Sequence, residues 1–369
     1  MLSFHFLNVG KGDCTILEYE TGGIRRFGLI DCNKTPARQS PAKEKLKQLG
    51  ASKLEFVCIT HPDDDHYTGI LDVLCEFQVE KFFTFPITKQ LSDSKARKKY
   101  LERLLQIAKG HDDQQLYQRS RELIEILVYA EKNFAKSGRW EEIAGNHSLV
   151  DVPNFLGVQL HGIAPPASVR GVFKNAIEKG DIGGSFSNND LSIALCIEYC
   201  GKRITLGGDV LGNVWNQHHF FQSRQNISIA SSLAKIPHHG SKLDCNEAFV
   251  NAVFPDSAIS KDCIAIVSAN GTTHPHQEAF SLLHAKGVQT LCTNLPNFYI
   301  KHAQKLITDK NLSAPFLGIL NTHAETTSRI SQPCQGDITV SVSSAGALYA
   351  TSQFRPFCPC SKRLDAFVA

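Results

Sequence analysis

The stretch Leu54-Glu55-Phe56-Val57-Cys58-Ile59-Thr60-His61-Pro62-Asp63-Asp64-Asp65-His66 joins a short apolar run to two histidines and three aspartates. The apolar part is rich in β-forming residues and predicts a buried strand, and residues 67–74 predict the start of a helix. A loop between a strand and a helix lies at the edge of a sheet, where a rigid scaffold can present ligands to a cleft. We therefore interpret the loop as a metal site; a solvated acidic loop is the alternative interpretation.

The composition is that of an ordinary globular protein. The chain has 369 residues, of which 42% are hydrophobic and 20% charged, with a net charge of +3. This length allows one large domain or two modest ones, and the small net charge neither requires nor excludes a nucleic-acid partner. No apolar run approaches the roughly 18 residues that a membrane helix needs, so no membrane partner is expected.

The 12 cysteines are scattered along the chain and show no repeated Cys-x-x-Cys spacing. This pattern argues against a structural zinc knuckle. The N-terminal residues predict a strand and show no basic segment followed by an apolar core, so we expect no signal peptide. Many thiols without an export signal predict a reducing, cytoplasmic environment.

The predicted secondary structure changes twice along the chain. Residues 1–85 alternate predicted strands, turns and one helix, whereas residues from about 88 to 150 are helical and charged. Strand patterns return near residue 155, and residues 337–351 predict a final hairpin. We expect a domain over residues 1–320, interrupted by a helical insertion at about 88–150, with the hairpin and tail of 321–369 packed on it. Paired strands flanked by helices predict an α/β fold, a four-layer αββα sandwich.

Three further polar motifs follow predicted strands. Gly207-Gly208-Asp209 follows residues 203–206, His238-His239-Gly240-Ser241 follows 233–237, and Thr273-His274-Pro275-His276 follows 264–268. Each motif alone is weak evidence, because a single Asp at a strand end is usually a cap and a single His is usually structural. Together they are strong evidence, since in a layered α/β fold such strand ends share one rim of the sheets.

The order of these motifs resembles that of the metallo-β-lactamase superfamily. Within it, the chain is most similar to the soluble hydrolase-like domain of ComEC-type DNA-uptake proteins and their stand-alone relatives. The resemblance covers about residues 3–300, apart from the insertion. It rests on seven motifs: Phe6–Asp13, Asp31, His61–His66, Asn189-Asp190-Leu191-Ser192, Gly208-Asp209, His238–Ser241 and His274-Pro275.

The resemblance implies the metallo-β-lactamase fold and a site for two divalent ions, zinc or manganese, with magnesium as a further option. By analogy, the first ion is held by His61, Asp63 and Asp209. The second is held by Asp65, His66 and His238, with Asp209 as the bridge. The usual His-x-His-x-Asp-His loop has a second His where this chain has Asp63. The His of the third motif is replaced by Asn188 or Asn189, and both changes favour harder ions such as Mn²⁺ or Mg²⁺.

The remaining motif residues have expected supporting roles. Asp31 and Asp13 would orient ligand histidines. His274 would protonate a leaving oxygen or bind a phosphate, and a turn-stabilising His is its alternative. The resemblance makes Asp65, Asp209 and His274 the catalytic candidates. Residues expected to contact water, substrate or the surrounding loop are Asn189, His239 and Ser241. Basic residues of the insertion that could contact phosphates, or form a solvated helix face instead, are Lys95, Arg97, Lys98 and Lys99.

The predicted function is a metal-dependent hydrolase, most specifically a two-metal phosphodiesterase or nuclease acting on DNA or RNA. The ligand cluster predicts only a metal hydrolase, and the ComEC-like resemblance adds the nucleic acid. One alternative is a hydrolase of a small phosphoester, a cyclic nucleotide or a lactone, because one fold hosts many chemistries. Another alternative is a degenerate scaffold that binds a partner protein through the insertion.

Overall fold

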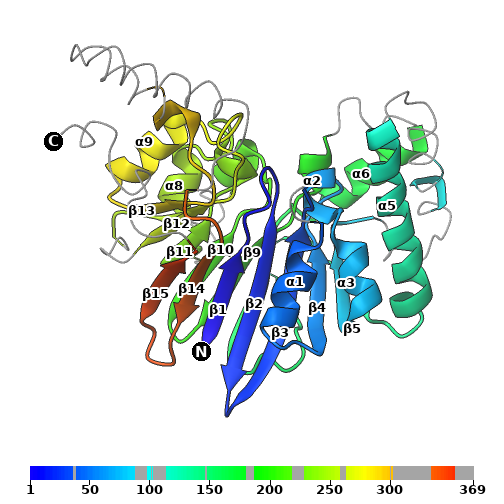
Figure 1. Ribbon diagram of the computed structural model, residues 1–369. Coiled ribbons are helices and arrows are strands. Elements are labelled where there is room, and N and C mark those ends of the chain that lie inside the picture. The colour runs from blue at the N-terminus through cyan, green and yellow to red at the C-terminus, as the bar shows by residue number, and fades with distance from the viewer. Residues whose placement is uncertain are drawn as a thin grey trace, which may run out of the picture.

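A computed structural model of the chain describes residues 1–35, 39–87, 98–100, 102, 114–145, 148–179, 187–217, 228–257, 263–299, 301 and 334–353. Within these residues the strands form one sheet of eight and one of seven. The two sheets pack face to face and helices cover their outer faces, so the chain is an α/β sandwich, and the predicted fold class is confirmed (Figure 1). No helix among these residues is long and apolar enough to span a bilayer.

The first sheet has the strand order β15-β14-β1-β2-β3-β4-β5-β6. Its antiparallel part runs from β15 to β3, and its parallel part runs from β3 to β6. The strands are β1 (Leu2–Phe6), β2 (Cys14–Thr21), β3 (Ile24–Cys32), β4 (Lys53–Ile59), β5 (Gln78–Thr84), β6 (Trp140–Glu142), β14 (Ile338–Val342) and β15 (Leu348–Ser352).

The second sheet has the order β13-β12-β11-β10-β9-β8-β7. Strands β10 to β13 are parallel, and β7 to β10 are antiparallel. The strands are β7 (Ser148–Val150), β8 (Val158–Ala164), β9 (Ala194–Tyr199), β10 (Lys202–Leu206), β11 (Leu233–Lys235), β12 (Ile264–Val267) and β13 (Gln289–Cys292).

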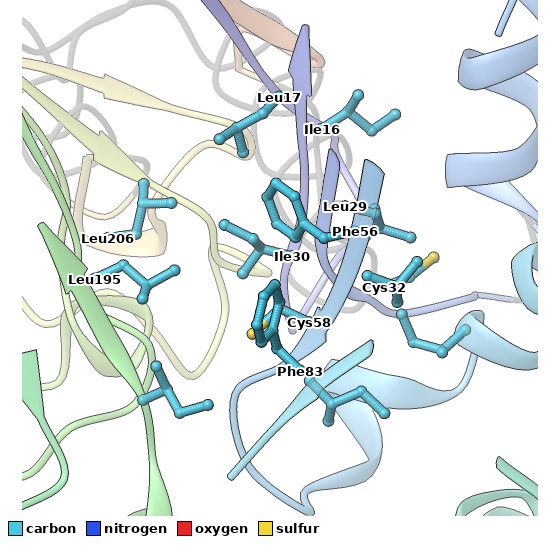
Figure 2. Close-up of a cluster of buried hydrophobic side chains, with 14 of the residues drawn as sticks. Ile16, Leu17, Leu29, Ile30, Cys32, Phe56, Cys58, Phe83, Leu195 and Leu206 are labelled. Atoms are coloured by element: carbon cyan, nitrogen blue, oxygen red, sulfur yellow. The ribbon is translucent and has the colours of Figure 1, made fainter. Parts of the chain in front are cut away.

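The main core lies between the sheets. Figure 2 shows Leu17 and Ile30 of the first sheet on the side of Leu195 and Leu206 of the second, while Ile16 and Leu29 point the opposite way. Successive side chains of a strand point to opposite faces, so strands with near-continuous apolar sequence bury both faces. This explains why Leu54-Glu55-Phe56-Val57-Cys58-Ile59 forms a central strand.

Helices cover the outer faces of both sheets (Figure 1). Helix α1 packs on β2 and β3, α3 packs between α1 and α5, and α9 packs on β13. The helices are α1 (Pro41–Gln48), α2 (Asp64–Tyr67), α3 (Ile70–Glu76), α5 (Gln114–Ala130), α6 (Val169–Lys179), α8 (Glu247–Val253) and α9 (Gln277–Ala285). Short helical turns are η1 (Glu131–Ala135), η2 (Asn188–Leu191) and η3 (His238–Gly240).

Two local features differ from the sequence-based expectation. The helix expected at 67–74 is split: α2 begins inside the acidic run, and α3 follows after a break where the Gly69 N–H donates to the Cys32 carbonyl (2.8 Å). That bond ties the break to the end of β3. The stretch expected to be a helical insertion contains α5 but also β6 and β7, which pair with β5 and β8 at the sheet edges. Short strands of three residues carry too little periodicity to be predicted.

The core around Phe56 gives a test of the sandwich. Phe56 is 1% exposed and packs its ring against Phe83 and Phe155, at centroid distances of 5.9 and 5.8 Å. Phe56→Ala should lower the free energy of unfolding by about 3–5 kcal/mol, because a cavity replaces a buried ring. Urea denaturation measures the change. Val128→Ala, at a 52% exposed position of α5, is the control and should change stability by less than about 0.5 kcal/mol. A Phe56→Ala protein as stable as the control would contradict this core.

Candidate metal centre

The polar motifs meet where the strands of both sheets end. Asp31 lies at the end of β3, His61 follows β4, Asp209 follows β10, and His239 follows β11. Four overlapping groups of side chains have potential ligand atoms within 4.8 Å of one another. The groups are His61, His66 and Asp209; Asp65, His66 and His239; Asp13, Asp209 and His239; and Asp13, Asp31 and His66.

Asp31 organises one side of the centre. Its carboxylate accepts hydrogen bonds from the Thr60 backbone N–H (2.8 Å), the Thr60 hydroxyl (2.7 Å) and Nδ1 of His66 (2.8 Å). All three residues are at most 3% exposed. Because Nδ1 of His66 donates its proton to Asp31, Nε2 is the nitrogen of this ring that can bind a cation.

Thr60 fixes the second imidazole in the same way. Its single hydroxyl proton is donated to Asp31, so the Thr60 oxygen accepts at 3.0 Å from Nδ1–H of His61. Nε2 of His61 is therefore the ring nitrogen left to face the centre. The two rings lie 4.1 Å apart between centroids.

His239 is the third imidazole of the centre. Its Nδ1 donates to the Ser268 carbonyl at the end of β12 (2.9 Å), so Nε2 is the ring nitrogen that faces the centre. That Nε2 lies 3.4 Å from an oxygen of Asp65 and 3.3 Å from an oxygen of Asp209. The ring is fully buried.

The atoms that face the middle of the centre are buried and make no hydrogen bond with the described residues. They are Nε2 of His61, His66 and His239, Oδ2 of Asp65 and Oδ1 of Asp209. Buried polar atoms without hydrogen-bond partners are unfavourable, and their presence in overlapping sets of ligand atoms within 4.8 Å of one another indicates a missing partner. Three imidazole nitrogens and two carboxylates are a donor set that Zn²⁺ and Mn²⁺ accept, and these residues therefore fit a divalent metal.

The electrostatics lead to the same interpretation. Burial alone lowers the pKa of His239, but the nearby carboxylates of Asp209, Asp65 and Asp13 outweigh burial and raise the pKa to about 10. The pKa of His66 is also raised, because Asp209 and Asp31 outweigh burial, and the pKa of Asp209 is held well below its usual range by His239 and His66 despite burial. The carboxylates thus attract positive charge, which a bound cation would supply in place of protons.

The backbone conformation of Gly208 lets the carboxylate of Asp209 reach the centre. Gly208 adopts φ +52°, and a Cβ there would overlap the Ile193 carbonyl and the Ser192 hydroxyl. The Ser192 hydroxyl accepts from the Asp209 N–H (2.8 Å). Glycine is therefore required before Asp209, whose two oxygens approach His66 (3.4 Å) and His239 (3.3 Å).

His238 lies at the rim. Its Nδ1 contacts Asp244 at 2.7 Å, its Nε2 is 3.8 Å from Asp209, and its side chain is 25% exposed. Both His238 and His239 have positive φ, so two consecutive left-handed residues turn their rings in different directions. The motif order predicts a ligand role for His238 and an outer role for His239, whereas the distances to Asp209, 3.8 Å from His238 and 3.3 Å from His239, favour the reverse assignment.

His274 is half-buried and stacks on His238, with ring centroids 5.6 Å apart. Its Nδ1 makes no hydrogen bond with described residues. Burial and the neighbouring charges of His239 and His238 lower its pKa to about 4. A neutral imidazole at pH 7 suits a hydrogen bond to a substrate oxygen better than donation of a proton.

The other expected site residues surround these groups. Asp13 forms a buried ion pair with Lys235 and approaches Nδ1 of His239 (3.7 Å) and of His66 (3.8 Å). Ser241 is buried, and its carbonyl accepts the Asp244 and Cys245 N–H groups. The Asn188 side chain donates to Asp63 at 2.6 Å, and Oδ1 of Asn189 is buried without a hydrogen-bond partner among described residues. Asp63 is 3.6 Å from Nε2 of His61.

The basic residues of the insertion are only partly placed. Lys95 and Arg97 lie outside the described residues, whereas Lys98 and Lys99 are exposed. Nζ of Lys98 lies 3.9 Å from Glu102, which is a surface ion pair of the kind that stabilises little.

A cavity of about 1090 Å³ adjoins the centre at Lys11 and Asp65. One wall is α5 of the insertion, and the others are the segment after β3 and helices α2 and α3. Its charged lining residues are Lys11, Lys34, Arg121, Asp64, Asp65, Asp72, Glu122 and Glu125.

Several contributing residues were not singled out from the sequence. Thr60 and Ser268 orient imidazoles, Asp244 holds His238, and Lys235 pairs with Asp13. The available signal was position, because Thr60, Lys235 and Ser268 each stand at the end of a predicted strand beside a motif. Such a position does not by itself distinguish an orienting side chain from a structural one.

No family model matches the chain, and no curated protein matches it. Among solved structures, it is similar to CmlA, a diiron β-hydroxylase from Streptomyces venezuelae: identity is 10%, coverage is 78% of this chain and 52% of CmlA, and the TM-score is 0.36. The chain thus spans about half the length of CmlA.

Two smaller proteins are also similar. A diphosphatase from the PhnP family shares 10% identity over 79% of this chain and 86% of its own, with a TM-score of 0.34. MEM-A1, a subclass B3 metallo-β-lactamase from a soil metagenome library, shares 11% identity over 76% and 84%, with a TM-score of 0.29.

The two adjacent histidines give a direct test of the centre. His239→Ala should weaken Zn²⁺ or Mn²⁺ binding at least tenfold, because it removes a buried ligand, whereas His238→Ala should weaken it less than threefold. Metal titration followed by calorimetry measures both affinities. His284→Ala, on α9, is the matched control and should bind as the wild type does. A larger loss in His238→Ala than in His239→Ala would contradict the assignment.

Glu122 of α5 gives a test of the cavity wall. Burial raises the pKa of its carboxyl to about 7, although Lys34, with Nζ 3.0 Å away, opposes the shift. The folded protein thus binds this proton more tightly than the unfolded chain, and the resulting stability is present below about pH 4.5 and lost as pH rises towards 7. Glu122→Gln should therefore stabilise the protein relative to the wild type more at pH 8 than at pH 5, as urea denaturation would show. An equal difference at both pH values would contradict this environment.

Proposed function

We propose that this chain is a metal-dependent hydrolase of the metallo-β-lactamase superfamily that cleaves phosphodiesters. The observation that carries the proposal is the convergence of three oriented imidazole nitrogens on two buried carboxylates. The order of the sequence motifs and the two-sheet sandwich support the family assignment, which is part of the proposal.

The first ion would be held by His61 and Asp63, and the second by Asp65, His66 and His239, with Asp209 shared between them. Divalent cations held by these residues would supply Lewis-acid activation of water and of a phosphoryl oxygen. Both proposed ligand sets combine imidazole with carboxylate, which suits zinc or manganese. The set of the first ion has more oxygen than nitrogen ligands and therefore also suits magnesium.

The chain's own residues supply orientation and charge. Asp31, Thr60 and Ser268 hold the three imidazoles in one tautomer, so no reorganisation is needed when substrate arrives. The neutral ring of His274, at the rim beside His238, can donate a hydrogen bond to a substrate oxygen. The buried surroundings of the carboxylates exclude bulk water and strengthen these interactions.

Nucleic acid is the proposed substrate, because the motif order resembles ComEC-type proteins. A small phosphoester is the second candidate, because five carboxylates against three basic side chains line the cavity beside the centre, and this excess of negative charge disfavours a second phosphate. A protein that binds no metal and cleaves no ester would instead support a degenerate scaffold.

Removal of the shared carboxylate tests the hydrolase. Asp209→Asn should lower kcat for bis-p-nitrophenyl phosphate with Mn²⁺ or Zn²⁺ by at least about 10³-fold, because one change removes ligand charge from both ions. Asp256→Asn, at an exposed aspartate paired with Lys286 (2.6 Å), is the control and should keep full activity. Wild-type turnover in Asp209→Asn would remove the bridging role.

A substrate panel separates the candidates. Labelled single- and double-stranded DNA and RNA, a cyclic nucleotide, a phosphomonoester and a lactone are incubated with the Mn²⁺-, Zn²⁺- or Mg²⁺-loaded protein. Cleavage of a nucleic acid supports the nuclease. Cleavage of a monoester or lactone without any phosphodiester would overturn the proposed phosphodiesterase.

A further inference from the structure

Lys11 is held beside the centre by its turn. The turn between β1 and β2 is pressed against the ligand loop, because Gly12 adopts φ +106° and a Cβ there would overlap the Asp65 carbonyl oxygen. The Asp13 N–H donates to that same oxygen (3.1 Å). The Lys11 carbonyl accepts from the Asn33 side chain (2.5 Å).

A third anchor comes from the other sheet. The Ser268 hydroxyl donates to the Gly12 carbonyl (2.9 Å), and the Ser268 carbonyl accepts from His239. The residue that orients a proposed ligand therefore also fixes the turn that carries Lys11. Such rigid placement is what a substrate-binding side chain requires.

The Lys11 side chain lies beside the carboxylate of Asp65 and is partly exposed to solvent. Its Nζ lies 3.3 Å from Oδ2 of Asp65, and the side chain remains 52% exposed. Burial lowers its pKa, but the charges of Asp65, Asp64 and Asp209 outweigh burial and raise it, so the ammonium is charged at neutral pH.

Fold stability gives little reason for a lysine here. A single ion pair with a half-exposed lysine contributes about 0–1 kcal/mol. The turn depends on its glycines and on backbone hydrogen bonds, which any side chain at position 11 would leave intact. A cation bound to Asp65 would take over neutralisation of that carboxylate and leave the ammonium facing the mouth of the cavity, which Lys11 and Asp65 line together.

We propose that Lys11 binds an anionic oxygen of the substrate at the mouth of the cavity, next to the ligands Asp65 and His239. This inference rests on the proposed function and names a phosphoryl oxygen as the ligand. Lys11 is a compact donor that can follow an oxygen as its charge grows. It supplies the positive charge that the neutral His274 does not. The cavity beside it, whose lining holds both acidic and basic side chains, then accommodates the rest of the same substrate.

The test compares Lys11→Met with Lys11→Arg. Calorimetry follows the binding of inorganic phosphate to the Mn²⁺-loaded, desalted protein, and initial rates follow bis-p-nitrophenyl phosphate. Lys11→Met should bind phosphate at least tenfold more weakly and raise KM by a similar factor, while metal content and thermal midpoint stay unchanged. Lys11→Arg should recover most of the phosphate affinity, because it restores the charge.

Lys43→Met is the matched control, since Lys43 of α1 pairs with the carboxylate of Glu76 (2.7 Å) and is not among the residues that line the cavity. It should behave as the wild type in both assays. Unchanged phosphate affinity in Lys11→Met, a wild type that binds no phosphate, or loss of metal from Lys11→Met would each overturn the inference. Lys11-dependent phosphate binding by a protein that hydrolyses no diester would sustain the inference and refute the hydrolase.

Discussion

The carboxylate of Asp31 is the constraint on which the centre depends. It accepts three hydrogen bonds, two from Thr60 and one from His66, and through the Thr60 hydroxyl it also sets the tautomer of His61. Two imidazoles are thereby held with their Nε2 lone pairs facing the same space. Without this acceptor the rings would be free to present a proton instead of a lone pair, and the acidic run of residues 61–66 would be a charged loop without a defined function.

The sandwich brings the residues of the centre together. Parallel strands of both sheets end on one rim, so ligands from four distant segments meet without long loops. Burial of unpaired carboxylates and imidazoles raises the free energy of the folded protein, and a bound cation would lower it again. Residues around the centre also contact its ligands. Asp13, which pairs with Lys235, lies near both His66 and His239. Ser268 links His239 to the turn of Lys11 through two hydrogen bonds.

The sequence predicted the sandwich, because runs such as residues 54–60 have the apolar pattern of strands buried on both faces. It also predicted which loops carry polar groups. It could not choose between His238 and His239, since both follow β11 and only their positive φ values decide which ring faces Asp209. Nor could it identify Lys11 or Thr60, whose importance comes from contacts across the chain. Strands β6 and β7 were missed because three residues carry no usable periodicity.

The most direct test of the central claim is anomalous diffraction from crystals grown with Mn²⁺ or Zn²⁺. The account predicts a strong anomalous peak bonded to Nε2 of His66 and His239 and to carboxylate oxygens of Asp65 and Asp209, with His238 outside bonding distance. A fully metal-loaded crystal with no peak among these four side chains, or with the metal held through Nδ1 of the rings, would contradict it.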